Sequence, residues 1–200
     1  MNLFPMHLLL WCFVLTSPIQ VQARDLGVLH FLAGDVRVDG RPAHLNMKIP
    51  TGTTVETGPG SIAEVRYGHE TGIRIRENSR VKLDRPGSTY RILLAHGTIL
   101  SLVKRKSVFE VKTPLAIAGV RGTVLFVHVS DDTSAYICTC NGKLDLLDGD
   151  RLMKAVSATH HKAYGLRGRP GNLVLGPEGM QMHTDVEIFE QLYRMEQEEP

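Results

Sequence analysis

The chain has 200 residues, of which 42% are hydrophobic and 22% charged, and its formal net charge at pH 7 is +2. A charge this small does not indicate a strongly charged partner such as a nucleic acid. The length suffices for one well-buried domain and an appended segment. Only three cysteines are present, so the position of each one is informative.

The first 23 residues, MNLFPMHLLLWCFVLTSPIQVQA, contain no Lys, Arg, Asp or Glu. Their apolar run, residues 8–15, is far shorter than the roughly 20 residues that span a bilayer. The segment ends in VQA, which has the small-x-small character of a signal-peptidase site. We therefore expect residues 1–23 to be a signal peptide, with an uncleaved membrane anchor as the alternative. Cleavage would remove Cys12 and leave a periplasmic or secreted protein with no stable membrane span.

Residues 27–150 show the alternation that is typical of half-buried strands. Segments such as AEVRYG (63–68), SRVKLD (79–84) and FEVKT (109–113) place apolar residues on one parity and Arg, Lys or Glu on the other. Turn pairs such as Asp-Gly, Pro-Gly and Asn-Gly separate the segments at short intervals. The region has no helical period, so the sequence predicts an all-β sandwich, barrel or short β-solenoid of many short strands.

Four stretches of this region resemble the FecR domain. They are GDVRVDG (34–40), IPTGTTVETGPGSIAEVRYGHETGIRIRENSRVKL (49–83), LAHGTILSLV (94–103) and FEVKTPLAIAGVRGTVLFVHV (109–129). The last stretch is the most specific, because it holds the TP…VRGT motif of residues 113–123. The resemblance covers residues 34–148 and implies an all-β periplasmic domain, a FecR-like sandwich or short β-solenoid, used for sensing, signal transfer or scaffolding. It implies no catalysis, and the sequence shows no nucleotide-binding or hydrolase motif.

The composition changes after this region. We assign residues 24–148 to the β domain and residues 149–200 to a C-terminal extension, made of a loop over 149–183 and a short α-helix. Thr184 and Glu187 form a T-x-x-E capping box at the start of the helix. The apolar residues on one face of this helix are Val186, Phe189, Leu192 and Tyr193. We expect the amphipathic helix to dock this apolar stripe on the β domain.

Cys138 and Cys140 are followed at once by Asn-Gly, a strong signal for a two-residue hairpin turn. A type I′ turn at residues 141–142 would place both cysteines on the more polar face of the hairpin, together with Lys143 and Asp145. The opposite, core face would hold Ile137, Thr139, Leu144 and Leu146. This register predicts that neither cysteine fills the core.

Two interpretations of Cys138 and Cys140 are a disulfide between them and a metal site that uses both thiolates. Residues i and i+2 of a strand have Cβ atoms about 6.6 Å apart, whereas a disulfide needs roughly 3.5–4.5 Å, so an intrastrand bridge requires distortion. Two thiolates at about 2.3 Å from one ion converge more easily, and imidazoles can complete a tetrahedron. The candidate metal-binding residues are Cys138, Cys140, His160, His161, His183 and Asp185, with Asp145 as a further carboxylate. The ion would be Zn, Cu or Fe.

The order of these residues resembles the ending of a group of exported FecR-like proteins, with C-x-C-x-G, then H-H, then H-T-D. We therefore predict an exported binding or sensing module of the cell envelope with a metal site, not an enzyme, whose partner is an envelope protein. The alternative is a structural or protein-interaction domain in which Cys138 and Cys140 form a disulfide. We expect no specific nucleic-acid binding by the basic stretch 66–121, because its Arg and Lys alternate at strand spacing without an aromatic platform.

Overall fold

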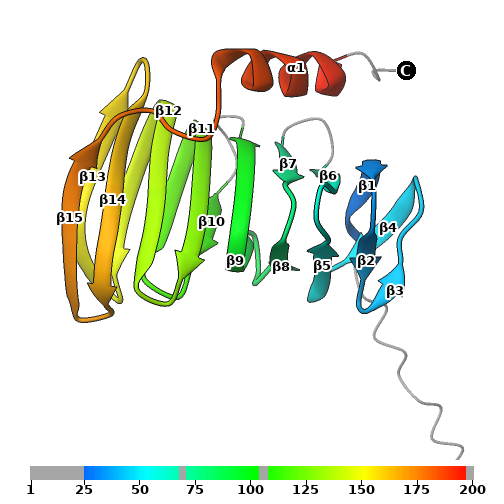
Figure 1. Ribbon diagram of the computed structural model, residues 1–200, viewed down its shortest axis with the longest axis horizontal. Helices are drawn as coiled ribbons and strands as arrows, with labels where there is room; N and C mark the ends of the chain where they lie inside the picture. The colour runs from blue at the N-terminus through cyan, green and yellow to red at the C-terminus, as the bar shows by residue number, and fades with distance from the viewer. Residues whose placement is uncertain (1–24, 68–70, 104–107, 197–200) are drawn as a thin grey trace, which may run out of the picture.

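The computed structural model describes residues 25–67, 71–103 and 108–196. They form a sheet of 15 strands and one C-terminal helix, α1 (Asp185–Glu196), which confirms the all-β prediction (Figure 1). The predicted signal peptide, residues 1–23, lies outside the described residues. Within the three described stretches, no helix has the length and apolar character needed to cross a membrane.

The strands are numbered in chain order. They are β1 (Asp25–Ala33), β2 (Val36–Val38), β3 (Arg41–Pro42), β4 (Met47–Pro50), β5 (Thr53–Thr57), β6 (Ile62–Tyr67), β7 (Thr71–Ile75), β8 (Ser79–Asp84), β9 (Tyr90–Val103), β10 (Phe109–Lys112), β11 (Ile117–Asp131), β12 (Ser134–Asp148), β13 (Arg151–Ala158), β14 (Lys162–Arg169) and β15 (Asn172–Glu178). The sheet is mixed, since β9 and β10 pair in parallel, whereas β9 pairs with β7, β8 and β11 in antiparallel fashion.

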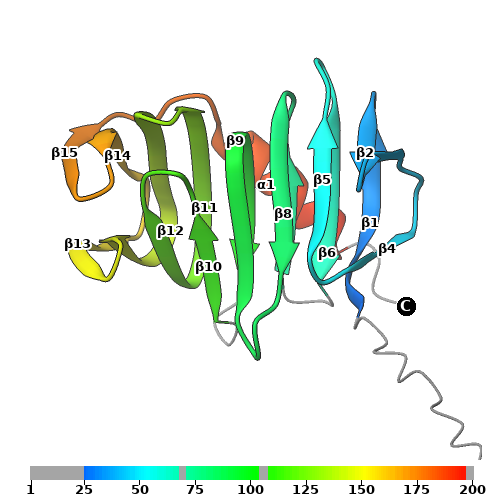
Figure 2. The same ribbon diagram turned by 90° about the horizontal axis from the view of Figure 1, so that it is seen from below.

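Three long strands, β9, β11 and β12, each take part in two layers of the sheet. The first half of β9 pairs with β8 and β10, and its second half pairs with β7 and β11. In β12 the first half, residues 134–139, pairs with β14, and the second half, residues 142–148, pairs with β13. We call the layer with β2, β5, β8, β10 and β13 the first layer, and the layer with β1, β6, β7, β14 and β15 the second layer. Figure 2 looks onto the first layer, with α1 on the far side.

Glycines with positive φ lie where the long strands bend from one layer to the other. They are Gly97 (φ 92°), Gly122 (φ 57°) and Gly142 (φ 108°). A Cβ on Gly142 would overlap the carbonyl oxygen of Gly122, so the bends of β11 and β12 pack directly on each other. The predicted hairpin turn at residues 141–142 is therefore wrong. Asn-Gly provides a positive φ for a bend within β12, which continues to Asp148.

The main core lies between the two layers. Its fully buried side chains include Ile99, Leu125, Val127 and Ile137 from the second layer and Val81, Leu83, Ile92 and Leu146 from the first layer. The predicted core face of the cysteine segment is confirmed, because Ile137, Thr139, Leu144 and Leu146 are all buried. The parity of the strand was therefore predicted correctly even though its turn was not, since alternation does not depend on where a strand ends.

The loop predicted over residues 149–183 is a second correction, because most of it forms β13, β14 and β15. The reason is that the bent strand β12 offers a separate pairing edge in each layer, and β13 and β14 occupy one edge each. Asp148 connects the turn between β12 and β13 to the turn between β14 and β15. Its carboxylate accepts hydrogen bonds from the backbone N–H of Gly171 at 2.8 and 3.0 Å. Arg151 also contacts this carboxylate, at 2.9 Å.

Helix α1 lies on the outer face of the second layer in the orientation opposite to the prediction. Ile188 and Gln191 are buried against the sheet, with exposed fractions of 8% and 1%. Three of the apolar side chains expected to dock are exposed, at 64% for Val186, 67% for Phe189 and 62% for Tyr193, whereas Leu192 lies outside the described side chains. Ion pairs account for this orientation, because Glu187 faces the sheet and reaches Arg74 at 3.5 Å and Arg76 at 3.9 Å.

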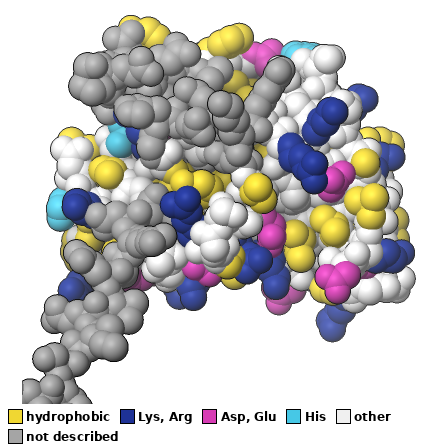
Figure 3. Space-filling view, turned by 180° about the vertical axis from the view of Figure 1, so that it is seen from behind, with side chains coloured by type: hydrophobic (Ala, Val, Ile, Leu, Met, Phe, Trp, Pro, Cys, Tyr) yellow, Lys and Arg dark blue, Asp and Glu magenta, His cyan; other side chains and the backbone are white. Residues whose placement is uncertain are grey.

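Charged side chains of both signs are mixed on the molecular surface. On the face seen in Figure 3, Lys and Arg side chains lie among Asp and Glu side chains. Several of the basic residues form ion pairs, such as Arg91 with Glu110 at 3.1 Å and Arg80 with Glu56. The basic stretch of the sequence thus contributes to local pairs across neighbouring strands.

Candidate metal centre

Cys138 and Cys140 lie in the half of β12 that belongs to the second layer, and their side chains point away from the main core. Their exposed fractions are 0% and 5%, because α1 and the segment before it cover them. The prediction that the cysteines lie on the more polar face and do not fill a core is therefore wrong. The two cysteines belong to a small apolar cluster that also contains Leu100, Leu102, Phe126, Tyr136, Ala163 and Ile188.

Two histidines complete a compact group with the thiols. Cys138 Sγ lies 3.4 Å from His161 Nδ1, and Cys140 Sγ lies 3.4 Å from His183 Nε2. The two sulfur atoms are 3.9 Å apart, and the two facing nitrogen atoms are 3.4 Å apart. All four atoms lie within 4.8 Å of one another. Both cysteines are free thiols, so the structure contains no disulfide between them.

These four separations match four of the six edges of a small tetrahedron, and the remaining two are at most 4.8 Å. With bonds of about 2.3 Å to sulfur and 2.0–2.1 Å to nitrogen, a tetrahedral zinc ion holds its ligands about 3.8 Å apart for two sulfurs, 3.3 Å for two nitrogens and 3.6 Å for a mixed pair. The four separations given above differ from these values by a few tenths of an ångström. The side chains are thus spaced to hold one ion without rearrangement of the backbone.

Each histidine has its second ring nitrogen engaged by an oxygen acceptor. His161 Nε2 donates to the Asp185 carboxylate at 2.7 Å, and His183 Nδ1 donates to the carbonyl oxygen of Gln181 at 2.7 Å. With these protons so placed, the nitrogen lone pairs that remain are those facing the sulfur atoms. Such outer acceptors orient a metal-binding imidazole and raise its basicity.

The segment before α1 brings His183 to the thiols. The Tyr136 hydroxyl donates to the carbonyl oxygen of Gly179 at 3.0 Å and accepts from the backbone N–H of Gln181 at 3.0 Å. Arg76 donates to the carbonyl oxygen of Met182. The His183 ring then stacks on Phe126 at 4.2 Å between centroids, with only 6% of the residue exposed.

The electrostatics of the group favour one negative charge on the thiol pair. The hydrogen bond from Cys140 lowers the pKa of Cys138, and contacts with His183 and His161 lower it further against the effect of burial. The same shared hydrogen bond, together with burial, raises the pKa of Cys140. Burial opposes a charge on His161, but Asp185 and Cys138 outweigh it and raise the pKa of this histidine. A thiolate is the form of cysteine that binds metals.

The structure brings four of the six predicted metal-binding residues into one group, and the other two, His160 and Asp185, form a second group with His161 whose ligand atoms also lie within 4.8 Å of one another. Asp185 stands behind His161 and does not face the sulfur atoms. His160 is exposed and packs its ring edge-on against His161, with centroids 4.6 Å apart. Asp145 lies in the other half of β12, where it pairs with Gly119 in the first layer. Sequence reasoning missed the supporting residues Tyr136, Phe126 and Gln181, because they carry no metal-binding pattern.

Comparison with known proteins assigns the fold class first. Two crystal structures of a candidate anti-sigma factor from Parabacteroides distasonis ATCC 8503, at 2.50 and 1.65 Å resolution, are similar to the chain with a TM-score of 0.52 each and 14% sequence identity. The match to the 2.50 Å structure covers 71% of this chain and 73% of the other chain. The match to the 1.65 Å structure covers 73% of this chain and 76% of the other chain. At this identity the likeness shows a shared all-β fold. No curated protein matches the sequence.

The family follows from the sequence itself. Residues 53–144 match the model of the FecR protein family, so the chain contains a FecR domain there. The match confirms the resemblance predicted from the sequence motifs. It includes both cysteines but ends before His161 and His183. The group of thiols and imidazoles is therefore shared between the FecR domain and the segment that follows it.

Proposed function

We propose that this chain is an exported binding or sensing module of the cell envelope, without catalytic activity, that holds one zinc ion through Cys138, Cys140, His161 and His183. The FecR domain supports the first part, because it is a domain of envelope-associated proteins. The observation that carries the metal site is the agreement of four ligand separations with a tetrahedron. An envelope protein is the proposed partner of the module.

Zinc is favoured over copper and iron by the shape and composition of the site. Two thiolates and two imidazoles in a tetrahedron form one of the common structural zinc sets, which leave no open position for substrate. The thiols and His183 are buried, so an ion held there would have little contact with solvent. The role that follows is structural, because the ion would tie β12, the turn before β14 and the start of α1 together.

Metal analysis of the mature protein tests the site. We expect about one zinc per chain by elemental mass spectrometry, as a single closed ligand set implies, and loss of this metal in a Cys138→Ser, Cys140→Ser double variant. His160→Ala is the matched control, because this histidine adjoins His161 in sequence but is exposed. Equal metal content in the double variant and the unaltered protein would disprove the site. Copper or iron in the same stoichiometry would support the site but show that the ion is not zinc.

Location is tested separately by cell fractionation and N-terminal sequencing. We expect a periplasmic or secreted protein that begins at Arg24. A cytoplasmic protein that begins at Met1 would contradict the proposal for export, whatever the metal content.

The competing function is that of a structural or interaction domain with a disulfide between Cys138 and Cys140. The sulfur atoms are 3.9 Å apart, and a bond at about 2.05 Å would require the strand to distort. Thiol titration separates the two functions. Thiols that react after a chelator is added support the metal site, whereas thiols that react only after reduction support the disulfide.

A further inference from the structure

The outermost strand of the second layer, β15, has an open edge. It pairs with β14 on one side, and no other strand of the described residues pairs with it on the other side (Figure 1). The edge is apolar, because Leu173, Val174 and Leu175 follow one another and no charged residue occurs in residues 172–176. An unpaired strand edge of this kind is a template for pairing with another chain.

The other terminal strands of the sheet carry features that discourage such pairing. The strand β3 has two residues, Arg41 and Pro42, and β4 contains Lys48 and Pro50. The strand β13 contains a basic residue at its start and another at its middle. Charged side chains, proline and short length are the means by which proteins protect strand edges. Among the terminal strands that the structure describes, β15 alone presents three adjacent large apolar residues without a charge among them.

The alternation of the backbone determines which groups of β15 point outward. In β14, the backbone N–H of Gly168 donates to the carbonyl oxygen of Thr133 at 2.9 Å and therefore points toward β12. The preceding residue of β14 then points toward β15, where it pairs with Val174, because successive residues of an antiparallel strand alternate in direction. On either side of Val174, Leu173 and Leu175 therefore direct their N–H and C=O groups away from β14, toward the open edge.

Proline and side-chain burial agree with this assignment. Pro177 lies two residues beyond Leu175 and shares its outward direction, so the missing N–H of the proline removes no hydrogen bond to β14. The side chains of Leu173 and Leu175 are half-buried and pack against the main core. The side chain of Val174 lies on the opposite face of the strand and is 68% exposed.

We propose that β15 pairs in antiparallel fashion with β15 of a second copy of this chain, about a two-fold axis at Val174. The run Leu-Val-Leu reads the same in both directions, so Leu173 of each copy lies opposite Leu175 of the other, and the two Val174 side chains face each other. The outward backbone groups of both leucines are then paired. All three central rows consist of apolar cross-strand pairs, which stabilise a sheet. The proposal does not rest on the metal site.

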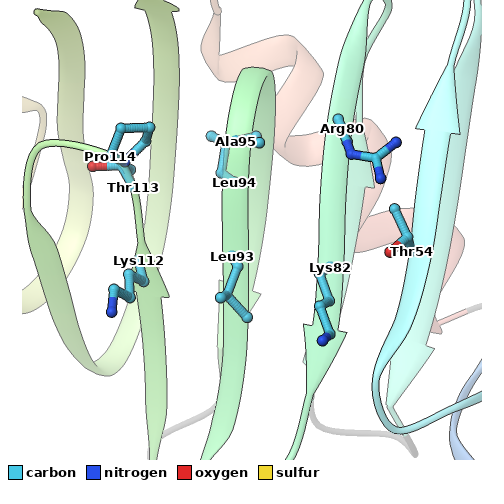
Figure 4. A pocket seen from close by; sticks show the side chains of 9 residues that line it. All are labelled: Thr54, Arg80, Lys82, Leu93, Leu94, Ala95, Lys112, Thr113 and Pro114. Atoms are coloured by element: carbon cyan, nitrogen blue, oxygen red, sulfur yellow. The ribbon is translucent and has the colours of Figure 1, made fainter. Parts of the chain in front are cut away.

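The outer face of the first layer is less suitable as a contact between two copies. It has a groove of about 310 Å³, in which Lys82, Leu93 and Lys112 occupy one row across neighbouring strands (Figure 4). Arg80 also lines this groove, so the lining contains three basic residues and no acidic one. Two copies stacked on this face would bring like charges together, which is unfavourable. The uncharged edge of β15 carries no such penalty.

Association about a two-fold axis ends at a dimer, because each copy uses the same edge and none is left for a third copy. One pair of short strands buries less than the roughly 800 Å² per partner of a standard interface, so the dimer is weak. Sedimentation velocity of the mature, metal-loaded protein should show a monomer–dimer equilibrium in which the dimer increases toward submillimolar concentration. A monomer at every concentration, or growth beyond a dimer, would overturn the proposal.

A charge at the two-fold axis tests the position of the contact. Val174→Lys should raise the dissociation constant of the dimer at least about tenfold, because two ammonium groups would then lie opposite each other. Val186→Lys is the matched control, since it changes another exposed valine, on α1, and should dimerise as the unaltered protein does. Circular dichroism checks that both variants are folded. An unchanged dissociation constant in Val174→Lys would contradict pairing through β15.

Cross-linking tests the register. In the proposed dimer the two copies of residue 174 form a pair without mutual hydrogen bonds, with Cα atoms about 4.5 Å apart, which is within the range of a disulfide. Val174→Cys should therefore form a linked dimer on mild oxidation with oxidised glutathione. Asn172→Cys is the control on the same strand, because residue 172 is exposed but lies about 14 Å from its own copy in this register. The unaltered protein gives the background from the native cysteines. Equal linking of both variants, or none with Val174→Cys, would overturn the proposed pairing.

Discussion

His161 and Asp185 are joined by a 2.7 Å hydrogen bond between Nε2 and Oδ1, although 24 residues separate them in the chain. One residue lies just before β14 and the other is the first residue of α1. The bond therefore connects the metal-binding face of the sheet to the start of the helix. It also directs the free nitrogen of His161 toward Cys138.

Replacement of Asp185 should weaken metal binding without unfolding the sheet. In Asp185→Asn the imidazole loses its charged acceptor, and we expect the affinity for zinc to fall by about 10- to 100-fold, as for other outer acceptors. Competition with a chromophoric chelator measures the change. Asp145→Asn is the control, because this carboxylate lies in the other half of β12. An affinity unchanged in Asp185→Asn would show that the hydrogen bond does not support the site.

Removal of the metal should release α1 from the second layer. Only Ile188 and Gln191 among the described side chains of the helix are buried. Besides the ion pairs of Glu187, the helix is attached through contacts of His183 and Asp185 at the candidate metal site. Hydrogen exchange of residues 183–196 should accelerate after chelation, whereas exchange in β9 and β11 should stay slow. The Cys138→Ser, Cys140→Ser variant should exchange rapidly with or without chelator. Equal protection of α1 in the loaded and chelated protein would contradict this expectation.

The packed bends of β11 and β12 predict a large difference between two glycine substitutions. Gly142→Ala and Gly171→Ala both place a side chain at positive φ, which costs about 1–3 kcal/mol. Only the Cβ at residue 142 would also overlap backbone, whereas the space around residue 171 is open. We expect Gly142→Ala to lower the free energy of unfolding by at least about 2 kcal/mol more than Gly171→Ala. Urea denaturation measures both, and equal losses would show that the two bends are not in tight contact.

Asp148 should make stability depend on acid pH. Hydrogen bonds from Gly171, followed by Arg151, lower the pKa of Asp148 below its ordinary value. A lowered folded-state pKa stabilises the protein above the unfolded-state pKa, near about 3.9, and this contribution is lost as the pH falls through the folded-state value.

Denaturation across this acidic range compares Asp148→Asn with the unaltered protein. The variant should be less stable at neutral pH, and the difference between the two should shrink as the pH falls. Asp132→Asn, at an exposed position in the turn between β11 and β12, is the control and should follow the unaltered protein. A difference that stays constant down to the lowest pH would show that the lost stability of Asp148→Asn does not come from ionisation.

The sequence predicted those features that depend on local alternation. Apolar and polar residues at a period of two identified the all-β fold and the inward side of Ile137 and Leu146 correctly. The same alternation correctly placed Cys138 and Cys140 on one face of the strand. It could not show that this side is buried, because the cover comes from α1, more than forty residues further along the chain.

The errors share a physical cause, which is that short signals have more than one structural use. Asn-Gly suits a hairpin turn and equally suits a bend that carries a long strand between two layers. An apolar stripe on a helix indicates burial, but ion pairs from Glu187 to Arg74 and Arg76 set the opposite face of α1 on the sheet. Adjacent histidines give no local sign of which one faces inward, and only the position of β14 decides in favour of His161.

The spacing of the four ligands along the chain has a consequence for the order of folding. Cys138 and Cys140 are adjacent on one strand, but His161 follows Cys138 by 23 residues and His183 follows Cys140 by 43. Because distant contacts form slowly, we expect the last ligand to reach the thiols after β13, β14 and β15 have paired. A chain that meets zinc early would hold it by two sulfur atoms, and completion of the tetrahedron would mark the end of folding.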